Sequence, residues 1–295
     1  MPFRMILGLA VVLSLSIGQA LASNAAGQET LVGIVGSDFV LLGADSSLSQ
    51  SIALTGNLDK IAVVLDRTLI AAAGDAADTD RLVNTIQAHA RIREYEEVGG
   101  DVHYVDCRVE PSVRIKSPTG LSVEALAYLA RYQIGGQLRT RAPLRANLLI
   151  AGLLPWSEET NRSGDYLSKR LQAQVRQLEG GHTSHKEPKV AATTEPGSPR
   201  PCLFWLDEYG SIREVPYGAH GYASNFLWSI LDEGYRPDLT LDEAESLMRR
   251  CFAQLRERYV INSPQEPCIK CVDKHGCRVL PPKDLKEAGK AERSS

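Results

Sequence analysis

Residues 30–45 read TLVGIVGSDFVLLGAD, and residues 60–78 read KIAVVLDRTLIAAAGDAAD. Each segment contains two short apolar runs separated by a polar pair, Ser37-Asp38 in the first and Asp66-Arg67 in the second. This pattern is typical of a β-hairpin. At residues 74–78 a glycine leaves the last strand, and an Asp-Ala-Ala-Asp sequence follows that suits the first turn of a helix. These segments therefore predict two antiparallel hairpins followed directly by a helix.

The composition is that of an ordinary globular protein. The chain has 295 residues, of which 43% are hydrophobic and 23% are charged, so it can bury a sizeable core as one large domain or two small ones. Its formal net charge of −3 provides no general attraction to nucleic acid or to an anionic membrane. Six cysteines are too few to form a disulfide framework in a chain of this length.

Residues 1–28 have the features of a leader. Arg4 precedes an apolar run over residues 5–17, and Ala20 and Ala22 are small residues at the spacing of a cleavage site. This pattern is typical of a secretory signal peptide, and the run is short for a membrane span. Two other interpretations stay open, a removable propeptide and a segment included from an upstream start.

Two amphipathic helices and a buried strand are predicted next. Residues 76–97 carry apolar side chains at helical spacing, and so does the segment after Ser122, a suitable N-cap. Residues 99–120 are polar and irregular, which indicates a surface insertion. Residues 146–152 read ANLLIAG, a short unbroken apolar run that predicts a buried strand.

The composition changes at residue 156. Residues 156–201 are rich in Glu, Ser, Thr, Gly and Pro and predict a long loop between two strands, with a short helix over 167–178 and a disordered part over 180–201. The elements expected after it are strands at 202–206 and 212–215, a helix at 222–232, a helix behind the capping box of Thr240 and Glu243, and strands at 268–272 and 277–280. Residues 281–295 form a charged tail.

This order of elements predicts an α+β fold, a four-layer αββα sandwich. Two antiparallel sheets stacked on each other, with a pair of helices on each outer face, would bury every apolar stripe described above. We assign residues 29–280 to one domain with insertions at about 99–120 and 156–201, preceded by the leader and followed by the tail.

The segment of residues 30–78 resembles the start of a proteasome 20S core β subunit. It shares the two hairpins, Asp45 at the end of the second strand, Lys60 before the third strand and a Gly-Asp-x-x-Asp step into a helix. The resemblance spans about residues 30–280 apart from the insertions and implies the fold of the N-terminal nucleophile hydrolases. In active members an N-terminal threonine attacks, its freed amine acts as the base, a lysine and an aspartate tune that amine, and a glycine N–H stabilises the oxyanion. By resemblance Asp45, Lys60 and Gly74 hold these places, and Thr30 is the candidate nucleophile.

Several departures from the active pattern predict a chain without catalytic residues. Residue 29 is Glu rather than Gly, and Glu hinders the close backbone approach that autolytic cleavage requires. Thr30 to Asp45 and Asp45 to Lys60 each span 15 residues, one short of the active pattern, and a slip of one residue turns a strand's side chains to the opposite face. Tyr222 stands where active members have a supporting serine, and no Asp or Ser-Gly turn follows the fourth helix at the family's spacing.

Three short strings, at residues 219–222, 146–152 and 272–276, resemble the non-catalytic subunit at the fourth β position. The resemblance implies a structural role in a seven-membered β ring, contacts with other β subunits and with the α ring, and a location in cytoplasm and nucleus. No cofactor, nucleic acid or membrane partner is expected. Two alternatives stay open: an active threonine protease that loses residues 1–29 and uses Thr30 with Asp45, Lys60 and Gly74, and a secreted amidase of the same fold.

The remaining signals favour structural roles. Cys268 and Cys271 form a CxxC pair, but positions three apart in a strand point to opposite faces, so we expect no metal site; Cys271 and Cys277 could face each other across the final turn. His220 is interpreted as a turn and packing residue rather than an acid or base. Asn161 begins a glycosylation sequon that matters only in a secreted chain.

Overall fold

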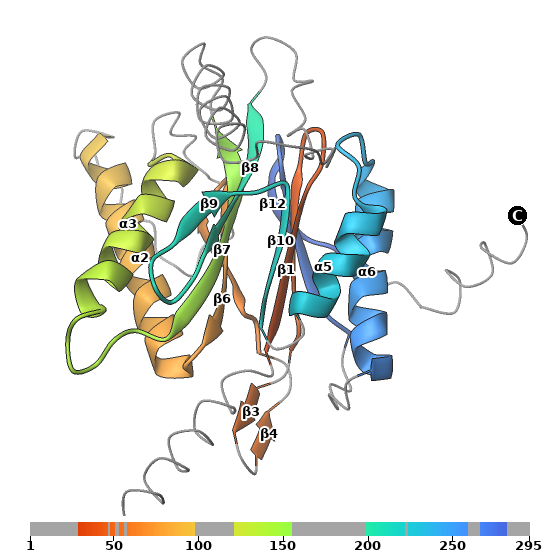
Figure 1. Cartoon of the computed structure of the whole chain (residues 1–295). Helices are drawn as coiled ribbons and strands as arrows, with labels where there is room; N and C mark the ends of the chain where they lie inside the picture. The colour runs from red at the N-terminus through yellow and green to blue at the C-terminus, as the bar shows by residue number, and fades with distance from the viewer. Residues whose placement is uncertain are drawn as a thin grey trace, which may run out of the picture.

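The computed structural model describes residues 29–46, 48–50, 53–55, 58–97, 121–154, 199–221, 224–258 and 266–281. Within these ranges the chain forms two stacked five-stranded sheets with two helices on each outer face, so the predicted α+β, four-layer αββα sandwich is confirmed (Figure 1). The leader, Cys107, the 167–178 helix, the sequon at Asn161, Tyr222 and most of the tail lie outside the described residues. In the described part no helix combines the length and apolarity needed to cross a membrane.

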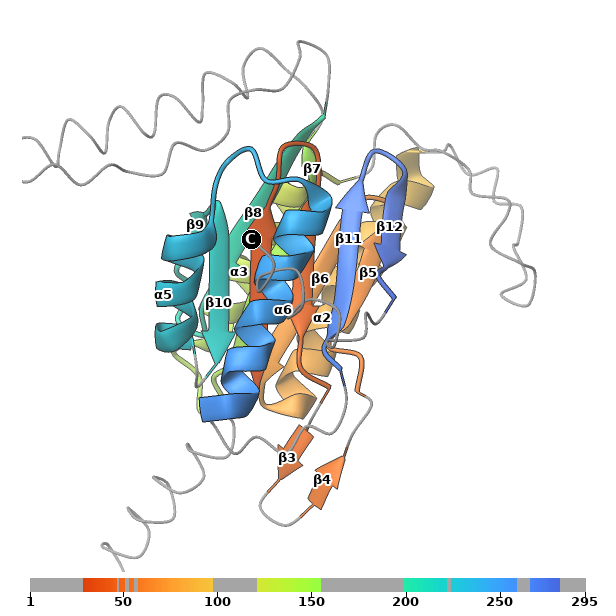
Figure 2. The same cartoon turned by 90° about the vertical axis from the view of Figure 1, so that its right-hand side faces the viewer.

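The first sheet has the strand order β10-β1-β2-β11-β12, and every neighbouring pair in it is antiparallel. Its strands are β1 (Thr30–Val35), β2 (Val40–Ala44), β10 (Tyr217–Gly221), β11 (Cys268–Asp273) and β12 (Gly276–Val279). Helices α5 (Ser224–Gly234) and α6 (Leu241–Arg258) cover its outer face (Figure 2). The capping box predicted for α6 is present, since Thr240 and Glu243 bond each other's side chains and backbone N–H groups.

The second sheet has the order β5-β6-β7-β8-β9 and is also antiparallel. Its strands are β5 (Ile61–Leu65), β6 (Thr68–Gly74), β7 (Ala146–Leu154), β8 (Arg200–Leu206) and β9 (Ile212–Glu214). Helices α2 (Ala76–Glu97) and α3 (Val123–Gln137) cover its outer face, and the hydroxyl of Ser122 caps α3 as predicted by accepting the N–H of Ala125.

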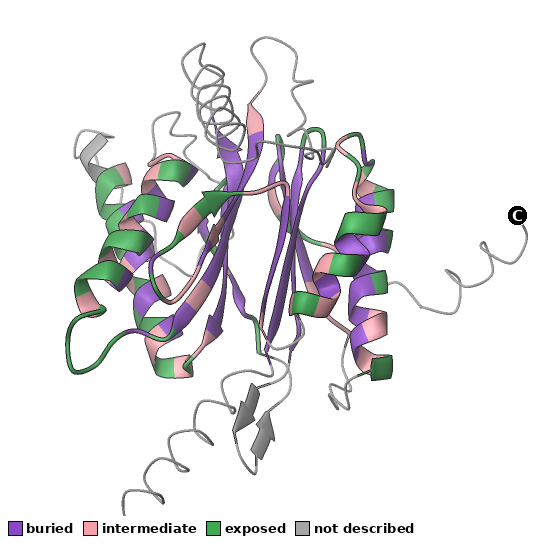
Figure 3. Ribbon diagram, in the orientation of Figure 1, coloured by how far each residue is buried: buried purple, intermediate pink, exposed green. Residues whose placement is uncertain are grey.

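Burial follows the layers. One apolar cluster lies between α5/α6 and the first sheet, a second between α2/α3 and the second sheet, and a third between the two sheets (Figure 3). Strand β1 divides its side chains between two of these layers, because alternate residues point to opposite faces. Val32 and Ile34 face α5 and α6, whereas Leu31 and Val35 face the second sheet.

The structure corrects the predicted elements in three places. Residues 217–221 form strand β10 beside β1, where the sequence indicated only a turn around His220. A small hairpin of β3 (Leu48–Gln50) and β4 (Ala53–Thr55), which the sequence analysis did not identify, projects from one end of the sandwich (Figure 2). Strand β8 begins at Arg200, so it includes the last two residues assigned to the long loop.

Candidate active site

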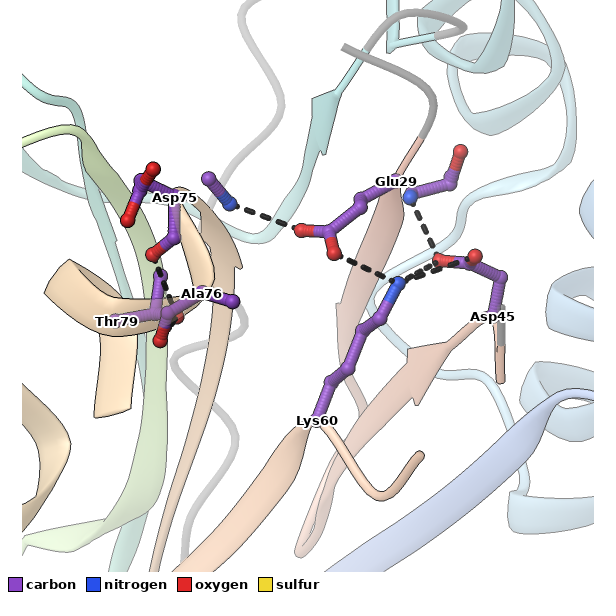
Figure 4. A network of polar contacts seen from close by, with 8 residues as sticks. Glu29, Asp45, Lys60, Asp75, Ala76 and Thr79 are labelled. Atoms are coloured by element: carbon purple, nitrogen blue, oxygen red, sulfur yellow. Dashed lines mark hydrogen bonds and ion pairs between the residues drawn. The ribbon is translucent and has the colours of Figure 1, made fainter. Parts of the chain in front are cut away.

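Four backbone segments meet at the end of the sandwich from which the β3–β4 hairpin projects. They are the start of β1, the residue after β2, the residue before β5 and the last residue of β6. The first two belong to the first sheet and the last two to the second, so the side chains that meet there connect the two sheets (Figure 4).

Lys60 is the centre of this cluster. Its Nζ lies 3.1 and 3.2 Å from the two carboxylate oxygens of Asp45 and 3.3 Å from Oε1 of Glu29. The Lys60 side chain is 2% exposed, and the Glu29 and Asp45 side chains are 9% and 10% exposed. One ammonium therefore pairs with two carboxylates in a region nearly closed to water, where charge–charge interactions are much stronger than at the surface.

Glu29 connects Lys60 to the end of β6, two residues before α2 begins. While its Oε1 faces Lys60, its Oε2 accepts the backbone N–H of Gly74 at 2.9 Å (Figure 4). Burial raises the pKa of the Glu29 carboxyl above its ordinary value, against the opposing effects of the Lys60 charge and the Gly74 N–H. The carboxylate is thus held by a cation and an N–H donor, although its surroundings disfavour the charged form.

The backbone at Gly74 explains why glycine is needed there. Gly74 has φ +142°, and a Cβ on it would lie 2.2 Å from the carbonyl oxygen of Arg145. In the next turn Asp75 accepts the N–H of Ala77 at 3.1 Å, and Asp78 accepts the N–H of Arg145 at 3.0 Å. The aspartates of the Gly-Asp-x-x-Asp sequence therefore fix the start of α2, and the Gly74 N–H remains directed at Glu29.

Thr30 lies next to this cluster, but its hydroxyl is not part of it. Its backbone N–H donates to Asp45 Oδ1 at 2.8 Å, so the main chain contributes to the site. Its Oγ1 is buried and has no hydrogen-bond partner among the described residues. The alternation along β1 accounts for this, because Thr30 shares the helix-facing side with Val32, and Glu29 shares the inter-sheet side with Leu31.

The structure thus brings together three of the four residues singled out from the sequence, Asp45, Lys60 and Gly74, and adds Glu29. Sequence reasoning treated Glu29 only as an obstacle to cleavage and Thr30 as the sole candidate nucleophile. The signal that could have identified Glu29 is its spacing: it precedes Asp45 by 16 residues, the separation of nucleophile and aspartate in the active pattern, whereas Thr30 precedes it by 15. Chemically, the site is a lysine–aspartate pair and an N–H donor, with a carboxylate in place of a hydroxyl.

His220 lies in the same inter-sheet layer in a packing role. Its ring stacks on Trp205 with centroids 4.6 Å apart, and its Nε2 lies 3.2 Å from the carbonyl oxygen of Leu148. Burial lowers the pKa of His220 to about 4, so the ring is neutral at pH 7. Trp205 Nε1 donates to the carbonyl of Ala219 at 3.2 Å, and together these contacts join β10 to β7 and β8.

The cysteines of the last hairpin lie on both faces of the first sheet. Cys271 packs toward α6, and Cys268 and Cys277 pack toward the second sheet. Cys277 is paired with Val272 and Cys271 with Arg278, so the expectation that Cys271 and Cys277 could face each other is wrong. In the described part of the chain, no group of His, Cys, Asp and Glu residues is arranged to hold a metal ion.

Two sheets lie between helix pairs, and a lysine, an aspartate and a glycine N–H gather at the start of the first strand. Together these features define the N-terminal nucleophile hydrolase fold. A family model described as "Proteasome subunit" matches residues 25–101 and 165–266, and the chain belongs to that family as a β-type subunit. It is 30% identical over 253 residues to a probable proteasome subunit beta type-4 of Schizosaccharomyces pombe, covering 85% of this chain and 98% of the relative. It is 26% identical over 251 residues to proteasome subunit beta type-4 of Saccharomyces cerevisiae (85% and 96%) and to proteasome subunit beta type-2 of Oryza sativa (85% and 88%).

Proposed function

We propose that this chain is a non-catalytic, structural β subunit of the 20S proteasome core particle, at the fourth β position. In this role it takes one place in a seven-membered β ring, contacts other β subunits and the α ring, and helps enclose the chamber in which other subunits cut unfolded or ubiquitin-tagged proteins. The location consistent with this role is cytoplasm and nucleus.

One observation supports the non-catalytic role most strongly. The carboxylate of Glu29 contacts both Lys60 and the Gly74 N–H, the two groups that would activate a nucleophile and stabilise an oxyanion in an active subunit. A carboxylate in that place has no hydroxyl with which to attack a substrate, and it occupies the N–H donor that a substrate carbonyl would need. The hydroxyl of Thr30 belongs to the other face of β1.

The experiment that tests this proposal is the isolation of the chain from native cells, in whatever complex it occupies. The N-terminal residue and the intact mass of the chain would be measured. The same preparation would be treated with a fluorescent peptide epoxyketone, which reacts covalently with an N-terminal threonine. We expect the chain to co-purify with a proteasome-sized particle, to begin at a residue other than Thr30 and to remain unlabelled.

The other outcomes distinguish the alternatives. A chain in the particle that begins at Thr30 and carries the label would overturn the proposal and establish an active threonine protease. A glycosylated chain that begins after Ala22 and is free of any particle would instead favour a secreted protein of the same fold. The labelled catalytic subunits in the same particle are the positive control for the probe.

A further inference from the structure

We propose that Lys60 and the Gly74 N–H form an anion-binding pocket whose ligand is the chain's own Glu29 carboxylate. Removal of that carboxylate would leave a site that takes a small free carboxylate such as acetate. This inference rests on the proposed function, because it explains what the site of a non-catalytic subunit does. The site thus keeps both donors and binds a side chain of the same protein.

The two donors are well suited to an anion. The Lys60 ammonium is nearly closed to solvent, with a side chain that is 2% exposed, and lies 3.3 Å from the Glu29 carboxylate. The Gly74 N–H approaches the other oxygen of the same carboxylate at 2.9 Å. Each oxygen therefore has a donor of its own, an arrangement that a free carboxylate could reproduce. Charge-assisted hydrogen bonds of this kind are stronger than those between neutral groups.

Both donors are held in place by groups other than Glu29. Lys60 also pairs with Asp45, and the conformation of Gly74 is set by the close approach of the Arg145 carbonyl and by the start of α2. The pocket should therefore persist when the Glu29 side chain is shortened. The same donors lie on the second sheet and Glu29 on the first, so the internal ligand also ties the two sheets together.

The backbone of Glu29 is fixed independently of its side chain. The following residue, Thr30, donates its N–H to Asp45, and Gly221 of the neighbouring strand lies so close that a Cβ on it would be 1.7 Å from the carbonyl oxygen of Glu29. Gly221 has φ +104°, a conformation that glycine adopts readily. The tethered carboxylate thus reaches the pocket from a rigid strand end, and its high local concentration excludes competing anions.

The test uses the full-length chain with the substitution Glu29→Ala. Alanine keeps the Cβ, so the atoms removed correspond in size to one acetate ion. Thermal unfolding would be followed in increasing acetate and, at equal ionic strength, in chloride and with neutral acetamide. We expect acetate to raise the melting midpoint of Glu29→Ala by about 2–4 °C more than chloride does, and to have no specific effect on the unsubstituted chain.

Two variants serve as controls. Adding Lys60→Met to Glu29→Ala should abolish the acetate response, because it removes the cation of the pocket. Glu257→Ala removes a carboxylate from an exposed position on α6 and should give no response. The proposal would be overturned if acetate raised the melting midpoint equally in all variants, or if it did not raise that of Glu29→Ala.

A second measurement applies if Glu29→Ala does not accumulate as a separate chain. The variant would be assembled into its native particle in acetate buffer, and the particle's structure determined. Density for acetate between Lys60 Nζ and Gly74 N supports the proposal, and its absence overturns it. Either failure would leave the non-catalytic role standing, because that role is tested by the start residue and by probe labelling.

Discussion

Lys60 and Lys270 are both buried between the two sheets, yet their partners differ. Lys60 pairs with two carboxylates whose side chains are 9% and 10% exposed. Lys270, on β11, contacts the carbonyl of Ile61 at 2.5 Å and Asp59 at 2.6 Å, and the Asp59 side chain is 58% exposed. The charge on Asp59 is therefore largely solvated, and the two charges facing Lys60 are not.

The comparison separates a structural tether from a functional cluster. Lys270 joins β11 to Asp59 before β5 and to the first residue of β5, at a modest electrostatic cost because Asp59 keeps most of its water. In the Lys60 cluster two carboxylates face one ammonium; burial raises the pKa of Glu29, and the Asp45 charge adds to this effect. A purely structural role would not require two buried carboxylates around one buried lysine, because buried ion pairs contribute little to stability.

The substitution Lys60→Met should have the largest effect. It leaves Glu29 and Asp45 as two buried carboxylates without their cation, and we expect a loss of about 3–5 kcal/mol in the free energy of unfolding at pH 7. Urea unfolding of the full-length chain measures this. A loss smaller than that caused by Lys270→Met would contradict the distinction between the two lysines.

Gly74→Ala should cause the next largest loss in the free energy of unfolding. The φ of +142° is unfavourable for alanine, and the new Cβ would meet the Arg145 carbonyl, so we expect a loss of about 2–3 kcal/mol. Gly135→Ala is the matched control, because Gly135 lies in helix α3 with open space around its Cα. That change should stabilise the chain by about 0.5–1 kcal/mol. If both substitutions behaved alike, the backbone at Gly74 would not be a constraint.

Lys270→Met should lower the free energy of unfolding by less, about 1–2 kcal/mol. Water can bind Asp59 in place of the lysine, and the methionine side chain replaces the apolar part of Lys270. Unfolding at low and high salt would be compared. We expect little salt dependence of the loss, since the Lys270 ammonium is buried. A loss of the size predicted for Lys60→Met would mean that solvation of the partner does not distinguish the two sites.

Most of the fold could be predicted because it depends on local patterns. Apolar alternation, the capping box at Thr240 and the N-cap at Ser122 act within a few residues, and each is present in the structure. Strand β10 was missed because its sequence, YGAHG, has no apolar alternation and is stabilised by pairing with β1 and by the stacking of His220 on Trp205. Long-range pairing of this kind leaves no local signal.

The site was predictable in part for the same reason. Asp45, Lys60 and Gly74 occur at strand ends, which the hairpin pattern locates. Glu29 was not identified because its role depends on which face of β1 it occupies, and a strand's absolute register is set by its packing. The burial of Leu31 between the sheets fixes that register and directs Glu29 to Lys60.

Glu29→Gln should have the smallest effect, and its sign depends on pH. Because the folded pKa of Glu29 lies above the ordinary value of 4.5, the folded chain binds this proton more tightly than the unfolded chain. The stability that the carboxyl contributes is therefore fully present below pH 4.5 and is lost as the pH rises through the folded pKa. The groups that face it are Lys60, Asp45 and the Gly74 N–H, none of which reverses this direction.

Urea unfolding would be measured at pH 4.5 and at pH 8. Relative to the unsubstituted chain, the free energy of unfolding of Glu29→Gln should be higher at pH 8 than at pH 4.5 by up to about 1 kcal/mol. If the unsubstituted chain gained stability on Glu29→Gln at the higher pH instead, the folded pKa of Glu29 would not be raised and the prediction would be wrong.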